Sequence, residues 1–178
     1  GAFAPNSYAS LQEIRESLID FKKSHKWIVA YGDSYTQSSY YLASVANDVY
    51  LNPQGMLDWH GLASQHVYLK DMLAKFGVKM QVSKVGKYKS ATETFTEEKM
   101  SDADRFQTTA YLNGIWKHLT KGVSESRNVS VAKLNEYADS MITFATPGDY
   151  IKMKLIDKLL YTDQVKGEIK KRLGINAD

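Results

Sequence analysis

The sequence has no cysteine, which excludes a disulfide framework, a cysteine-based zinc site and a thiol nucleophile. It also has no apolar run of about eighteen residues, the length that a membrane-spanning helix requires. None of the histidines shows HExxH or a similar metal-binding spacing; they are His25, His60, His66 and His118. We therefore predict no metal, no cofactor and no segment that crosses a bilayer.

An excess of charge of one sign is also missing, because 23 basic residues are nearly balanced by 20 acidic ones and the net charge is +3. The lysines are scattered rather than clustered, which is typical of a solvated surface. The sequence therefore predicts no nucleic-acid partner.

What the sequence does have is the composition of a globular domain. It comprises 178 residues, of which 43% are hydrophobic and 24% are charged, and these values exclude a disordered or collagen-like chain. A chain of this size buries a real core. It shows no internal repeat, low-complexity tract or linker, so we expect one domain over residues 1–178.

Helical and strand patterns alternate along the chain. Helical spacing of apolar residues and helix-start signals predict helices at residues 10–24, 36–46, 65–75, 101–121 and 130–140, a short one after 146–149, and a last one over 162–174. Ser10 and Glu13 have the spacing of a capping box for the first helix. Short apolar or alternating runs predict strands at residues 27–31, 49–51, 56–58 and 78–85.

The alternation of strands with helices places the chain in the α/β class. The strand at residues 27–31 is continuously apolar, which is typical of a strand buried on both faces. The first helix begins almost at residue 1, whereas a parallel sheet usually has strands before it. We therefore expect the chain to be truncated at its amino end.

Two segments indicate chemistry. The run GKYKSA over residues 86–91 places Lys89 among small and aromatic residues, directly after the last predicted strand of the first half. The run QSSYYLAS over residues 37–44 lies in the second predicted helix. Together with YGDSY at 31–35 and LNPQG at 51–55, these segments resemble the signal peptide peptidase A family in its long bacterial form, which has two tandem domains.

The resemblance implies a ClpP/crotonase-like fold and a membrane-associated serine protease that degrades cleaved signal peptides with a Ser-Lys dyad. In long members, the amino-terminal domain supplies the lysine and the carboxy-terminal domain supplies the serine. By this resemblance Lys89 is the general base, whereas Gln37 occupies the position that carries the serine in short members. We therefore expect residues 1–178 to be the lysine-bearing domain, inactive without the serine-bearing one.

The resemblance also implies partners and a location. The partners are the serine-bearing domain of the same protein, further protomers in a homo-oligomer, and signal peptides or other peptides as substrate. The location is the periplasmic side of a bacterial inner membrane, with the anchor outside this sequence.

A lysine acts as a base only when its amine is neutral. A solvated lysine has a pKa near 10.4, and burial must lower that value by roughly three units to produce a working base. The surroundings must therefore be apolar and free of carboxylates. Without the partner domain we expect Lys89 to be exposed and protonated, and we expect Ser90 to hydrogen-bond the amine and orient it.

Other residues have simpler interpretations. Ser38 and Ser39 are hydroxyls at a helix start, where hydroxyls cap free N–H groups, rather than nucleophiles. Ser130 is expected to cap a helix in the same way. Nothing in the sequence supports an acid–base pair between Asp58 and His60.

Two alternative functions remain open. One is a structural module that helps to form the oligomer, for which Lys89 would be dispensable. The other is a crotonase-type acyl-CoA enzyme, in which paired backbone N–H groups surround a thioester oxygen. The sequence lacks a glycine-rich segment of the right kind after a strand, which disfavours the second alternative.

Overall fold

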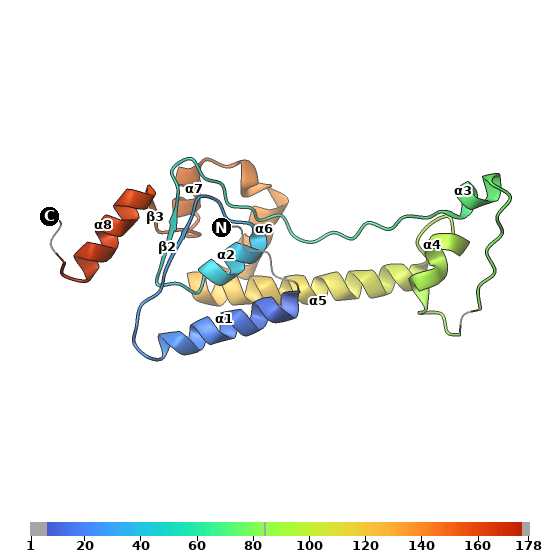
Figure 1. The fold of residues 1–178 in the computed structure, drawn as a ribbon, viewed down its shortest axis with the longest axis horizontal. Coiled ribbons are helices and arrows are strands. Elements are labelled where there is room, and N and C mark those ends of the chain that lie inside the picture. Colours follow the sequence, from blue (N-terminus) through green and yellow to red (C-terminus); the bar gives the residue numbers. More distant parts are fainter. Residues whose placement is uncertain (1–6, 84, 176–178) are drawn as a thin grey trace. The chain divides into compact units, whose positions relative to one another are not determined.

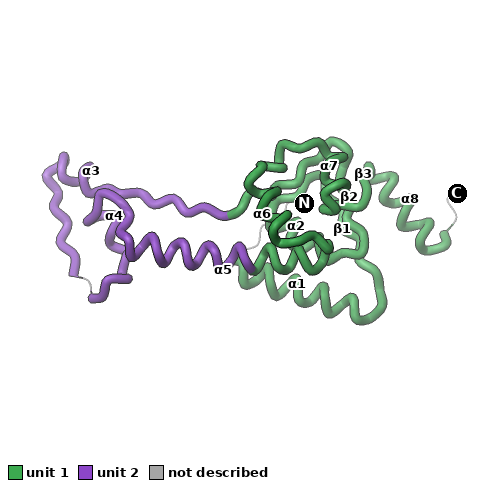
Figure 2. Tube along the Cα trace, turned by 180° about the vertical axis from the view of Figure 1, so that it is seen from behind, with its two compact units in different colours: residues 1–61, 118–178 green, residues 62–117 purple. Residues whose placement is uncertain are grey.

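The computed structural model describes residues 7–83 and 85–175. Its internal contacts divide the chain into two compact units, which Figure 2 colours separately. Unit 1 comprises Gly1–Gly61 and His118–Asp178, and unit 2 comprises Leu62–Lys117. Each unit has its own packing, and the assignment of residues 1–178 to one lysine-bearing domain stays a prediction.

Within the described residues, unit 1 contains a parallel sheet of three short strands in the order β1-β2-β3. They are β1 (Val29–Gly32), β2 (Asp48–Leu51) and β3 (Lys158–Leu159). Val29 lies opposite Asp48, and Tyr50 lies opposite Lys158. Helices flank these strands (Figure 1). The prediction of an α/β fold with short parallel strands and flanking helices is confirmed, and it is consistent with the ClpP/crotonase-like type.

Most helices lie where the sequence predicts them, although their ends differ. They are α1 (Tyr8–Lys22), α2 (Gln37–Ala43), α3 (Lys70–Lys75), α4 (Glu93–Thr96), α5 (Asp102–Arg127), α6 (Val131–Asp139), α7 (Pro147–Lys152) and α8 (Thr162–Arg172). Single 3-10 turns lie at Ser90–Thr92 and Ile142–Phe144. Helix α5 continues past its predicted end at residue 121.

Side-chain caps fix where several helices begin. Ser7 caps α1, because its hydroxyl accepts the N–H of Ser10 at 3.1 Å, so the prediction of a capping box that starts at Ser10 is wrong. Thr36 caps α2 by accepting the N–H of Ser39 at 3.2 Å. Ser130 caps α6 as predicted, by accepting an N–H of the first turn.

Two predictions for unit 2 are wrong. Helix α3 begins later than the predicted residue 65. The strand predicted at residues 78–85, of which residue 84 lies outside the described part, does not form, and its alternating apolar side chains are exposed: Val78, Met80, Val82 and Val85. The alternation is present, but none of the described strands lies beside it, so its backbone has no ladder to join.

The sheet also differs from the prediction. Strand β1 is half-buried at each position rather than buried on both faces, because it lies at an edge of the described sheet. The strand predicted at residues 56–58 is reduced to a parallel bridge between Tyr35 and Leu57. Strand β3 was not predicted, because its two residues are too few to show an alternation of apolar and polar side chains.

The core of unit 1 contains aromatic side chains whose polar atoms have partners. Tyr40 and Trp59 are fully buried, and their ring centroids lie 6.0 Å apart in an edge-to-face arrangement. The hydroxyl of Tyr40 donates to the carbonyl of Leu155 at 2.8 Å, and the indole N–H of Trp59 donates to the carbonyl of Leu134 at 2.9 Å. Buried phenols and indoles need such partners, so these bonds fix α2 and residue 59 within the core.

A buried guanidinium joins three helices of unit 1. Arg15 on α1 is 3% exposed, and it donates to the carbonyl of Tyr41 and, at 2.9 Å, to the hydroxyl of Ser44. On α5 it donates to the carbonyl of Gly122 and to the hydroxyl of Ser126, both at 2.6 Å. The four acceptors lie at the end of α2, where Ser44 is the C-cap residue, and on α5, so this one side chain holds α1, the end of α2 and α5 together.

Replacing Arg15 with methionine removes these donors but keeps much of the apolar stem. We expect Arg15→Met to lower the free energy of unfolding by about 2–4 kcal/mol, because buried acceptors lose their partner. Urea denaturation followed by circular dichroism measures the change. The matched control is Arg105→Met, at an exposed arginine, for which we expect a change of about 0.5 kcal/mol or less. Equal losses in the two variants would contradict this role for Arg15.

The carboxylate of Asp157, just before β3, is held by β2 and α5. It accepts the backbone N–H of Val49 at 2.7 Å and the two terminal N–H groups of Arg127, at 2.7 and 3.0 Å. Burial alone would raise the pKa of Asp157, but the bonds from Arg127 and Val49 outweigh burial and lower that pKa. The ionised form is therefore the one that the fold stabilises.

A lowered folded-state pKa gives a stabilisation that is complete above the unfolded value, about 3.9, and that is lost as the pH falls through the folded value. We expect Asp157→Asn to cost about 1–3 kcal/mol near neutral pH and to cost little in strong acid. Urea unfolding at the two pH values measures both costs. Asp139→Asn, at an exposed carboxylate of α6, serves as the control. A cost of Asp157→Asn that is the same at both pH values would overturn the assignment.

Candidate functional site

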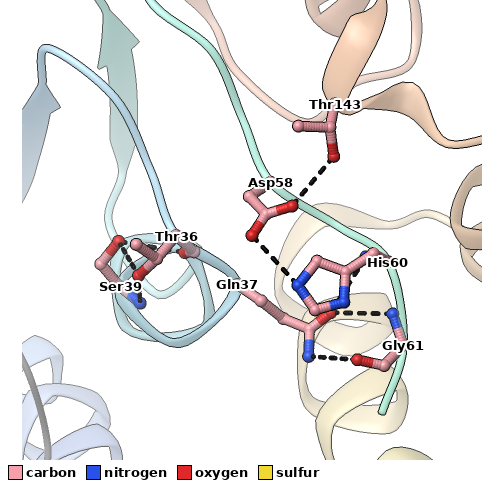
Figure 3. Close-up of polar contacts among 7 residues, drawn as sticks. All are labelled: Thr36, Gln37, Ser39, Asp58, His60, Gly61 and Thr143. Carbon is pink, nitrogen blue, oxygen red and sulfur yellow. Dashed lines mark hydrogen bonds and ion pairs between the residues drawn. The ribbon is translucent and has the colours of Figure 1, made fainter. Parts of the chain in front are cut away.

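Gln37, the residue that the resemblance matches to the serine position of short family members, has its side-chain amide bound to backbone groups. Gln37 is the first residue of α2 and is 6% exposed. Its Oε1 accepts the backbone N–H groups of His60 and Gly61 at 3.2 and 3.1 Å, and its Nε2 donates to the carbonyl of Gly61 at 3.1 Å (Figure 3). A carboxamide in this role is no nucleophile, so Gln37 anchors the 60–61 segment instead.

The hydroxyls at the start of α2 are engaged locally. Ser39 donates its hydroxyl to the carbonyl of Thr36 at 3.0 Å, while its N–H is capped by the Thr36 hydroxyl (Figure 3). The cap is therefore Thr36, whereas the sequence analysis assigned capping to Ser38 and Ser39. Neither contact gives Ser39 a base, which agrees with the prediction that it is not a nucleophile.

The structure joins Asp58 and His60, a pair that the sequence analysis considered unsupported. His60 Nε2 lies 3.1 Å from Asp58 Oδ2, and Thr143 donates its hydroxyl to Asp58 Oδ1 at 2.9 Å (Figure 3). The two residues are separated by one residue of a non-helical run, and alternate side chains of extended backbone point to the same side. That spacing is the signal that was missed.

The pair between Asp58 and His60 lacks a group to activate. Among the described residues, the contacts of the His60 ring include no hydroxyl, because the Thr143 hydroxyl is turned to the carboxylate of Asp58. The pair, together with the amide of Gln37, therefore fixes the 58–61 segment on both sides. The contacts shown for this part of unit 1 are those of a loop held in place by side chains.

Lys89 belongs to unit 2, where a tight turn presents it to solvent. Gly86 has a positive φ of 93°, which glycine adopts without strain, and the N–H of Lys89 donates to the carbonyl of Gly86 at 3.3 Å. Gln107 on α5 donates its side-chain N–H to the carbonyl of Tyr88 at 3.1 Å. The backbone on either side of the lysine is thus fixed, while its side chain is exposed, as predicted for the chain without its partner.

The acid nearest to Lys89 in the sequence is directed elsewhere. Glu93 on α4 is 2% exposed, and its carboxylate accepts the hydroxyl and the N–H of Ser101 at 2.8 and 3.3 Å. Within residues 7–83 and 85–175, Lys89 has no ion pair with a carboxylate. Ser90, half-buried at the start of the 3-10 turn, follows directly, and its orienting role stays a prediction.

Apolar side chains around this turn are left uncovered. Val85 is 88% exposed, Tyr88 is 47% exposed and Phe95 is 38% exposed. The neighbouring Lys87 places its Nζ 5.0 Å from the centroid of the Tyr88 ring. Apolar side chains are therefore exposed on the same turn as Lys89.

Neither a metal nor a membrane span is found in the described part of the chain. No group of three or more His, Asp or Glu side chains in residues 7–83 and 85–175 is arranged to hold a metal ion. None of the helices described there combines the length and the apolarity needed to cross a bilayer.

Comparison with known proteins adds a family and several relatives. Residues 20–176 match the model of peptidase family S49. The chain is 36% identical over 171 residues to Protease 4 of Salmonella typhi, covering 93% of this chain and 28% of that protein. It is 39% identical over 120 residues to Protease 4 of Haemophilus influenzae, covering 67% of this chain and 20% of that protein.

A plant relative extends the similarity over nearly the whole chain. Serine protease SPPA, chloroplastic, of Arabidopsis thaliana is 30% identical over 176 residues, covering 96% of this chain and 25% of that protein. The chain thus spans about a quarter of the length of the curated relatives that it matches.

The anchoring role of Gln37 is testable by truncation. We expect Gln37→Ala to lower the free energy of unfolding by about 1–3 kcal/mol, because the backbone groups of His60 and Gly61 lose their partners. Hydrogen exchange should become faster at the amides of those two residues. Gln54→Ala, in an exposed turn, is the matched control. Unchanged exchange at residues 60 and 61 would show that the amide does not hold this segment.

Proposed function

Because the chain belongs to peptidase family S49, we propose that it supplies a lysine general base, Lys89, to a serine protease whose nucleophile lies in another domain. The proposed substrates are cleaved signal peptides, and the proposed location is the periplasmic side of a bacterial inner membrane. The active form would be a homo-oligomer in which the missing domain covers Lys89.

The observation that carries this proposal is that the chain offers an exposed lysine, Lys89, while a glutamine, Gln37, stands where the resemblance would place the serine. Gln37, which the resemblance matches to the serine position, contacts three backbone groups of the 60–61 segment, and its amide cannot act as the nucleophile. Lys89, in contrast, is exposed on a fixed turn and makes no ion pair with a carboxylate in the part of the chain that the structure describes. A lysine base without a serine nucleophile supports an active site whose serine comes from another domain.

The physical need for a partner follows from what a lysine base requires. An amine surrounded by water remains protonated at neutral pH, and desolvation is the effect that neutralises it. The exposed Val85, Tyr88 and Phe95 are suited to exclude water once a second surface covers them. The carboxylate of Glu93 accepts hydrogen bonds from Ser101 and makes no ion pair with Lys89 within the described residues, so it does not stabilise the protonated amine.

In the completed site the neutral amine takes the proton from the serine hydroxyl while the serine oxygen attacks the peptide carbonyl. The amine then delivers that proton to the nitrogen of the departing peptide, and an acyl-enzyme remains. The amine then takes a proton from water while the water oxygen attacks the acyl carbon. The bond between that carbon and the serine oxygen breaks, and the ammonium returns the proton to the serine oxygen. Each step uses one lysine and needs no metal.

The test uses the complete polypeptide with a single substitution. We expect Lys89→Ala to lower kcat/KM for a signal-peptide substrate by at least about 100-fold, the usual range for the loss of a general base. Peptide hydrolysis followed by chromatography measures the loss. Lys87→Ala, two residues away and directed at the Tyr88 ring, is the matched control and should retain most of the activity. Circular dichroism should show the same fold in both variants.

The same experiment separates the proposal from its structural alternative. If the chain only assembles the oligomer, Lys89→Ala will hydrolyse peptides as fast as the unaltered protein. A second arm uses residues 1–178 alone, which we expect to cleave no peptide until the serine-bearing domain is added. Peptide cleavage by residues 1–178 alone would refute the divided site.

A further inference from the structure

Unit 2 contains a second set of reactive groups, which the proposed protease does not use. The Oγ of Ser64 lies 3.0 Å from Nε2 of His66. The other ring nitrogen of His66, Nδ1, lies 3.4 Å from Oδ2 of Asp104. A hydroxyl, an imidazole and a carboxylate are therefore connected in series, with a different partner at each ring nitrogen.

Local structure explains how these residues meet. Ser64 and His66 are two residues apart in a run without helix or strand, and alternate side chains of such extended backbone share a side. The next alternate residue, Tyr68, points its hydroxyl into a buried position, where it has no partner among the described residues. Asp104 lies in the first turn of α5, where its N–H donates to the hydroxyl of Ser101 at 3.2 Å.

Burial decreases along the series from Asp104 through His66 to Ser64. The side chain of Asp104 is 7% exposed and that of His66 is 31% exposed, while Ser64 lies at the surface. The first turn of a helix favours a negative charge, so α5 stabilises the carboxylate of Asp104. A carboxylate beside Nδ1 favours the tautomer with the proton on that nitrogen, and in this tautomer the lone pair of Nε2 faces the hydroxyl of Ser64.

We propose that Ser64, His66 and Asp104 form a nucleophilic site that accepts acyl or phosphonyl groups from activated esters. The Oγ of Ser64 attacks the carbonyl carbon of an aryl ester, and its proton passes to Nε2 of His66. The new bond joins Oγ to the acyl carbon, the bond between that carbon and the aryl oxygen breaks, and the phenolate leaves. Asp104 stabilises the imidazolium that results.

Activated esters are the matching class because a phenolate leaves without being protonated. A peptide nitrogen, in contrast, must receive a proton as it leaves, and peptide hydrolysis depends strongly on donors for the oxyanion. This site is separate from Lys89 and Gln37 in its residues and its substrates. Its activity is therefore expected in residues 1–178 alone, which we expect to cleave no peptide.

The experiment treats the 178-residue chain with a fluorophosphonate. This reagent transfers its phosphonyl group to an activated serine oxygen and releases fluoride. We expect one adduct, located at Ser64 by tandem mass spectrometry, and no adduct at Ser17, an exposed serine that donates its hydroxyl to a helix carbonyl. His66→Ala should slow the labelling by about 100-fold. Free imidazole should restore much of the rate, which a merely structural histidine would not allow.

Two further variants make the result decisive. Ser64→Ala should abolish the adduct, and Asp104→Asn should slow labelling while the adduct stays at Ser64. Circular dichroism checks that α5 persists in Asp104→Asn; if that variant unfolds, His66→Ala with and without imidazole decides the question. An unlabelled Ser64 in the unaltered chain, or equal labelling rates with and without His66, would overturn the proposal.

Discussion

The buried guanidinium of Arg15 is the interaction on which the arrangement of unit 1 depends. It binds acceptors on α2 and α5, which lie far away in the sequence. The close approach requires Gly122, because a Cβ there would lie 2.8 Å from Cε2 of Tyr41 and 3.2 Å from Nε of Arg15. By holding the end of α2, the guanidinium also fixes the direction in which Gln37, at the start of that helix, meets the 60–61 segment.

The elements of unit 1 could be predicted where local signals and burial agree. Two apolar runs became β1 and β2, and Ser130 caps α6 as expected. The predicted end of α5, just before Gly122, was wrong because that glycine makes room for neighbouring side chains instead of ending the helix. In unit 2 the alternation at residues 78–83 is genuine, but a strand needs a neighbour, and local sequence does not report whether one is present.

The candidate sites could be predicted only in part. The exposure of Lys89 could be predicted from the sequence, because the resemblance implies that a second domain covers this lysine and the chain was expected to lack that domain. The contact between Asp58 and His60 was missed because their spacing matters only if the backbone between them is extended. The approach of Asp104 to His66 joins residues distant in the sequence, so a single sequence without contact information carries no signal for it.

The uncovered apolar stretch at residues 78–83 has a consequence for the life of the protein in a cell. An irregular exposed backbone is the kind of segment that degradative proteases cut first. A copy in which residues 78–83 stay exposed would therefore be cut there more readily than a copy in which another surface covers them.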